Sequence, residues 1–176
     1  MKRLLELVLV AIGFAGTGVA AGEISRNLNI WYSQWAPTME VLVAGVPFCV
    51  LASALCARKF PMAALVAIAD CLAWFVALSI RALLTDKHRY HALILAGLVG
   101  GLGVAGATGF GCRRLFRWYA LTSIGVAGLL AALPFALVGN LDTSLPELCA
   151  AFAVWQAAVG TLLFAFSRDP HSGDNL

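Results

Sequence analysis

The chain has 176 residues, of which 61% are hydrophobic and 12% are charged, and its mean hydropathy is +0.89. Soluble domains are about 45–50% apolar and about 25% charged, so this composition excludes an ordinary soluble globule, a disordered tail and a collagen-like chain. The net charge of +3 comes from short clusters between long apolar runs, which leaves no separate domain for binding nucleic acid. We therefore expect a polytopic membrane protein in contact with the lipid bilayer.

Six apolar runs approach the length of about 20 residues that a membrane-spanning helix needs. The runs are continuous rather than alternating, which favours helices over the strands of a β-barrel. We expect an all-α helical bundle that forms one membrane domain over residues 1–176, with a short outer loop at 85–91 and a cytoplasmic tail at 167–176. The expected spans are 4–22, 40–57, 62–84, 92–111, 120–139 and 148–166.

The basic residues divide unevenly between the two sets of loops. Cytoplasmic loops of membrane proteins are enriched in Lys and Arg. With the N-terminus in the cytoplasm, eight Lys and Arg residues lie on the inner side and three on the outer side. We therefore expect both termini in the cytoplasm and the chain in a plasma (inner) membrane. The inner residues are Lys2, Arg3, Arg58, Lys59, Arg113, Arg114, Arg117 and Arg168.

One inner segment, residues 112–119, interleaves basic and aromatic side chains. This pattern suits an anionic leaflet, with Arg113, Arg114 and Arg117 meeting lipid headgroups. The same pattern also fits a plain topology anchor or a docking surface for a membrane protein partner.

The two halves of the chain share features in the same order, which indicates a 3+3 inverted repeat of the kind found in many transporters. A Gly-x-Ala-Gly segment occurs at 13–16 and at 103–106, and a Pro-Phe pair follows in the next span of each half. Proline removes a backbone hydrogen bond, so we expect helix kinks at Pro47 and Pro134. Paired interruptions point to a transport site, although proline is also simply tolerated in membrane helices.

Seven glycines crowd the fourth expected span. Gly97 and Gly101 are spaced as in the small-xxx-small pattern of close helix packing. Gly13, Thr17 and Ala21 form a similar stripe in the first span. We therefore expect the first and fourth spans to pack together, and glycine-rich faces to lie at the interface of a homo-oligomer.

Asp70 lies deep inside the third expected span, too far from either surface for its short side chain to reach water. Ionisable residues at such depth are costly and are functional candidates by default. An isolated carboxylate there either stays protonated or finds a partner, and the candidate partners are Gln156, Thr108 and Thr122. Asp70 is then either a proton, cation or ligand site, or a neutral residue that joins helices by hydrogen bonds.

Motifs of enzyme chemistry are absent from the sequence. It contains no HExxH motif and no GxSxG motif, and Asp70 has no second intramembrane aspartate with which to form an acid pair. The five cysteines form no CxxC pair of the kind that binds zinc. From these absent motifs we expect no catalysis, no metal and no cofactor. We expect a permease or channel for a small solute or ion, with a site formed by Asp70, Gln156, Thr108 and Trp155. The alternative is a non-catalytic accessory or assembly subunit of a larger membrane complex.

Overall fold

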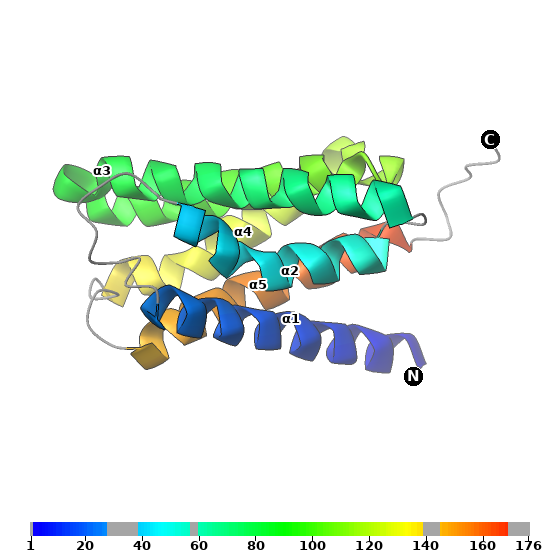
Figure 1. The fold of residues 1–176 in the computed structure, drawn as a ribbon, viewed down its shortest axis with the longest axis horizontal. Coiled ribbons are helices and arrows are strands. Elements are labelled where there is room, and N and C mark those ends of the chain that lie inside the picture. The colour runs from blue at the N-terminus through cyan, green and yellow to red at the C-terminus, as the bar shows by residue number, and fades with distance from the viewer. Residues whose placement is uncertain (1, 28–38, 57–59, 139–144, 169–176) are drawn as a thin grey trace.

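The computed structural model describes residues 2–27, 39–56, 60–138 and 145–168. Every regular element in this part of the chain is a helix, which confirms the predicted all-α class. The helices lie side by side as an elongated bundle (Figure 1). They are α1 (Lys2–Asn27), α2 (Met39–Cys56), α3 (Phe60–Gly109), the 3-10 helix η1 (Arg113–Phe116), α4 (Trp118–Val138) and α5 (Leu145–Ser167).

Helix α3 doubles back on itself. A straight α-helix rises about 1.5 Å per residue, so Asp70 and Thr108 would lie about 57 Å apart along it. Their side chains are instead 3.2 Å apart, and the two arms of α3 run next to each other in Figure 1. The expected outer connection at 85–91 does lie between the two arms. It is assigned as helix and not as an irregular loop, so the expected loop conformation is wrong. No glycine or proline occurs between Pro61 and Gly97 to break the backbone pattern.

Five segments of the described chain are long and apolar enough to cross a membrane, and two of them are the arms of α3. Helix α2 is apolar over Val43–Cys56, which is shorter than the about 20 residues a span needs. The second expected span, 40–57, corresponds to α2, which runs from Met39 to Cys56. The five long segments are Lys2–Ser25, Pro61–Ile80, His91–Gly109, Trp118–Leu137 and Cys149–Ser167.

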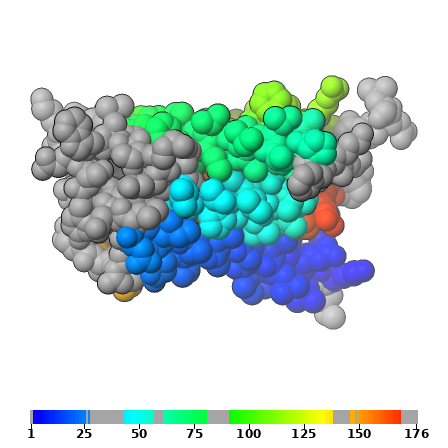
Figure 2. All heavy atoms as spheres, viewed as in Figure 1, coloured from blue at the N-terminus to red at the C-terminus, as the bar shows by residue number. Residues whose placement is uncertain are grey.

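Large apolar side chains are exposed along the outside of the bundle. On α1, Leu5, Leu9 and Ile12 are each 60% or more exposed, and their spacing places them on one helix face. Leu65 and Ile68 form a similar stripe on α3. The space-filling view shows α1, α2 and the first arm of α3 along one side of the molecule (Figure 2). Continuous apolar surface of this extent suits contact with lipid, and the chain is an integral membrane protein.

An aromatic cluster fills the centre of the bundle. Phe14 of α1 packs on Phe48 of α2 with ring centroids 5.3 Å apart, and Phe48 packs on Trp155 of α5 at 5.7 Å. Trp155 in turn meets Trp74 of α3 at 5.6 Å. Each such pair stabilises packing by about 0.5–1.5 kcal/mol beyond the area it buries. The cluster joins four helices and fixes how they are arranged around the polar residues described below.

The predicted packing of the first span against the fourth is wrong. Helix α1 makes no contact with α3 within the described chain. Gly97 lies instead against Gly128 and Ala132 of α4, while Gly18 of α1 lies against Ala153 of α5. A stripe of small residues favours close approach but does not specify the partner helix. Because the face around Gly97 is filled within the chain, an oligomer needs another surface.

Several other predictions stay predictions. Helices α2 and α4 continue through Pro47 and Pro134, and the expected kinks and inverted repeat are not tested. Of the expected tail, residues 169–176 lie outside the described residues. The beginning of α1 and the end of α5 do lie at the same end of the bundle (Figure 1).

Candidate intramembrane site

Asp70 faces the interior of the bundle and not the lipid. It lies on the first arm of α3, inside the candidate span Pro61–Ile80, and its side chain is 0% exposed. The return of α3 brings Thr108 opposite Asp70, and Thr108 is also fully buried. The Thr108 hydroxyl is 3.2 Å from each carboxyl oxygen of Asp70. One hydroxyl proton is therefore shared between two acceptor atoms.

The surroundings of Asp70 contain no compensating positive charge in the described part of the chain. Thr108 and the neighbouring Cys71 thiol are the polar groups that act on the carboxyl. A buried carboxylate with a single hydroxyl donor is unfavourable unless it is neutralised. A bare carboxylate is therefore costly at this position, whereas the protonated acid needs no counter-ion.

A pair of thiols lies next to this carboxyl. Cys49 of α2 is buried, and its side chain lies next to that of Cys71, the residue that follows Asp70 on α3. Both thiols are free. Thiols are weak donors and acceptors of moderate polarity. The wall beside Asp70 is therefore less apolar than a wall of aliphatic side chains.

Gln156 belongs to a second polar pair, between α5 and α1. Its side chain is 0% exposed, and its Oε1 atom accepts a hydrogen bond from the Thr17 hydroxyl at 2.7 Å. The same hydroxyl is 2.7 Å from the backbone oxygen of Phe14, so the two acceptors compete for one proton. The Nε2 atom of Gln156 is buried and has no hydrogen-bond partner among the described residues.

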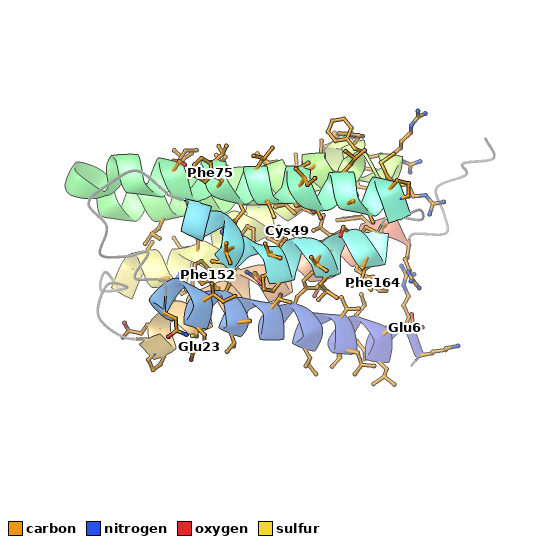
Figure 3. The ribbon with its side chains drawn as sticks, viewed as in Figure 1. Glu6, Glu23, Cys49, Phe75, Phe152 and Phe164 are labelled. Carbon is orange, nitrogen blue, oxygen red and sulfur yellow. The ribbon has the colours of Figure 1, made fainter. Side chains whose placement is uncertain are left out.

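Trp155 is held by one weak hydrogen bond and by its ring contacts. Its indole Nε1 donates to the backbone oxygen of Gly97 at 3.4 Å, which is long for a hydrogen bond. Trp74, which packs on its edge, has a buried Nε1 with no partner in the described chain. Phe152 of α5, which is labelled in Figure 3, packs on Trp74 with ring centroids 5.2 Å apart.

The expected site residues thus divide into two groups. Asp70 and Thr108 lie together, while Gln156 and Trp155 lie with α1 and the returning arm of α3. No hydrogen bond joins Asp70 to Gln156 among the residues that the structure describes. Thr122 is not a partner of Asp70, because it is exposed on α4 and its hydroxyl donates to the Trp118 backbone oxygen at 2.8 Å.

Sequence reasoning missed two residues of these groups. Thr17 appears in the sequence only as one position of a small-residue stripe, although a hydroxyl inside a span is itself a sign of a polar contact across helices. Cys49 gives no such sign, because its proximity to Cys71 depends on how α2 packs on α3.

No protein-family model, no curated protein and no solved structure matches this chain.

Proposed function

We propose that this chain is a small permease that moves a proton or a small cation through the membrane, with Asp70 as the residue that binds it. The observation that carries the proposal is a fully buried carboxyl whose one side-chain hydrogen-bond donor in the described chain is the Thr108 hydroxyl. Intramembrane carboxyls in such positions mark ion and proton pathways.

Thr108 is suited to both charge states of Asp70. A hydroxyl is a donor and also an acceptor. It donates to the ionised carboxylate, and it accepts from the carboxylic acid after a proton arrives. The 3.2 Å distances to both oxygens allow either arrangement without movement of the backbone. The pair therefore lowers the cost of changing the charge at this position.

Unpaired donors elsewhere in the core support a hydrated or ligand-bearing interior. Gln156 Nε2 and Trp74 Nε1 are buried donors with no acceptor in the described part of the bundle. Buried polar atoms are normally satisfied by protein, water or ligand. Water or a solute oxygen at these atoms would supply the missing acceptors.

The test is ion flux in liposomes that contain the purified protein. Proton flux is followed with an internal pH-sensitive dye, and Na⁺ and K⁺ flux with ion-sensitive dyes. We expect flux of at least one of the three ions above that of empty liposomes. Replacement of Asp70 by Asn should return the flux to the background, because the amide cannot exchange a proton or balance a cation.

Glu23 provides the matched control. It is an exposed carboxyl of α1 outside the core (Figure 3), so Glu23→Gln removes one carboxylate without touching the Asp70 pair and should leave the flux unchanged. Absence of flux for all three ions in the wild-type protein would contradict the proposal. Equal flux in Asp70→Asn and wild type would contradict the role of Asp70.

We also propose that the chain lies in the inner membrane with both of its termini on the cytoplasmic side. The excess of Lys and Arg on one side and the position of α1's beginning beside α5's end support it. A reporter fused to the C-terminus, active only in the periplasm, should give no signal.

The alternative function is that of an accessory subunit, and one surface favours it. Phe110 and Trp118 are 70% and 77% exposed beside η1, where Arg113 is also exposed. A partner subunit would cover these rings, as would the headgroup layer of the membrane. A stoichiometric partner recovered in mild detergent, together with no ion flux by the chain alone, would favour the accessory role.

A further inference from the structure

A pocket with a basic rim opens at the end of the bundle where α1 begins and α5 ends. Its volume is about 370 Å³. It lies apart from the Asp70 pair, and none of its lining residues takes part in the polar contacts of the core. The lining residues are Lys2, Arg3, Glu6, Leu7, Phe164, Ala165 and Arg168.

The polar lining has an excess of positive charge. Lys2, Arg3 and Arg168 are cations, while Glu6 is the one carboxylate, so two positive charges remain. Phosphate groups are recognised by such clusters of Lys and Arg. The guanidinium carbon of Arg168 lies 4.8 Å from the centroid of the Phe164 ring, a cation–π contact that holds this charge beside the pocket.

The rest of the pocket lining is apolar. Leu7, Phe164 and Ala165 form it. On the adjoining face of α1, Leu4 and Leu5 are 67% and 60% exposed. A ligand with a charged head and a hydrocarbon tail would therefore find cations and apolar side chains in the same pocket, and exposed apolar side chains on the same turn of α1.

We propose that this pocket binds the phosphate headgroup of an anionic phospholipid, with an acyl chain along the exposed face of α1. The excess of positive charge and the apolar lining together fit a lipid, whereas a free phosphate would use the basic residues alone. The site is independent of the proposed ion permeation at Asp70.

Native mass spectrometry of the purified protein tests this proposal. The protein is equilibrated in detergent with a mixture of phosphatidylglycerol and phosphatidylcholine, and the bound lipid is weighed. We expect one phosphatidylglycerol to be retained in preference to phosphatidylcholine. Arg168→Gln should weaken this retention about fivefold, since each basic residue near a membrane surface contributes about 1 kcal/mol of attraction.

Arg113→Gln is the matched control. Arg113 is another exposed arginine, at the η1 turn, where contact with lipid headgroups is also expected, but it does not line the pocket. Its removal should therefore weaken the retention of phosphatidylglycerol less than Arg168→Gln does. If both arginine variants lose the lipid equally, diffuse attraction explains the binding and the pocket is overturned as a site. If neither loses it, the proposal is also wrong.

Two further measurements of lipid retention test the proposal. Glu6→Gln removes the carboxylate from the rim and should raise phosphatidylglycerol retention, an opposite sign that loss of folding cannot imitate. Glycerol 3-phosphate in large molar excess should not displace the lipid. Displacement would show a site for free phosphate, and lower retention in Glu6→Gln would contradict the charge argument.

Discussion

Two polar pairs join helices inside this bundle, and they differ in charge. Thr17 and Gln156 join α1 to α5 through a hydrogen bond of 2.7 Å between neutral groups. Asp70 and Thr108 join the two arms of α3 at 3.2 Å, and one partner is a carboxyl. The neutral pair is explained by packing alone. The pair with a carboxyl is not, because its stability depends on a proton or a cation.

The two pairs differ in what a hydrogen bond between helices contributes and in what it costs to place the polar groups inside the membrane. Hydrogen bonds between membrane helices contribute about 0.6 kcal/mol on average and at most about 1.7 kcal/mol. An ionised aspartate at the centre of a span costs about 2.5–3.5 kcal/mol on insertion scales. A serine or an asparagine at position 70 would join the arms at lower cost. This difference in cost is the reason why we propose a function at Asp70 and not at the neutral pair.

The largest stability effect is expected where the returning arm of α3 meets α4, since this contact positions Thr108. A Cβ on Gly97 would lie 2.7 Å from the Cβ of Ala132 and close to the Gly128 backbone oxygen. We expect Gly97→Ala to lower the free energy of unfolding by about 1–3 kcal/mol through overpacking.

The control for Gly97→Ala lies on the same arm. Gly106 has open space around the position of a Cβ, so Gly106→Ala should leave stability unchanged or raise it slightly through helix propensity. Thermal or denaturant unfolding in one detergent measures both variants. Similar losses in the two would contradict the contact of α3 with α4.

A smaller effect is expected at the neutral pair. In a double-mutant cycle with Thr17→Val and Gln156→Leu, we expect a coupling of about 0.6–1.7 kcal/mol in the free energy of unfolding. The coupling arises because Thr17→Val leaves the buried Gln156 Oε1 atom without its donor, whereas Thr17 keeps the Phe14 backbone oxygen as an acceptor when Gln156 is replaced. A coupling near zero would show that Thr17 bonds only to the backbone oxygen of Phe14.

The smallest stability effect is expected at Asp70 itself. Asp70→Asn keeps the shape of the side chain and an oxygen that accepts from Thr108, so the free energy of unfolding should change by less than about 1 kcal/mol. Unfolding in detergent under the conditions used for the flux assay measures this. A loss of several kcal/mol would mean that the carboxyl is structural and would contradict its assignment to ion binding.

The sequence predicts the helices of this protein better than their partners. Continuous apolar runs identify the membrane segments, because backbone groups in hydrocarbon must be paired within a helix. Position 70 stands out for the same reason, as a charge where charges are costly. The sequence does not show that α1 packs on α5 and α2 rather than on the returning arm of α3, because small-residue stripes on different helices are chemically alike.

The choice of Thr108 over Thr122 as the partner of Asp70 also depends on tertiary structure. Both threonines lie in apolar helices, and only the reversal of α3 places Thr108 beside Asp70. Thr122 lies on the exposed side of α4 and bonds to its own helix. The contact of Cys49 with Cys71 has the same origin, since it requires the packing of α2 on α3.

Infrared difference spectroscopy of the Asp70 carboxyl tests the central claim most directly. In the wild-type protein in lipid, we expect a band of a protonated carboxylic acid that is missing in Asp70→Asn and that shifts soon after transfer into D₂O without unfolding. Such exchange would show that this buried acid communicates with water. A protonated band that shifts only when the protein unfolds would identify a sealed structural contact and would contradict the account.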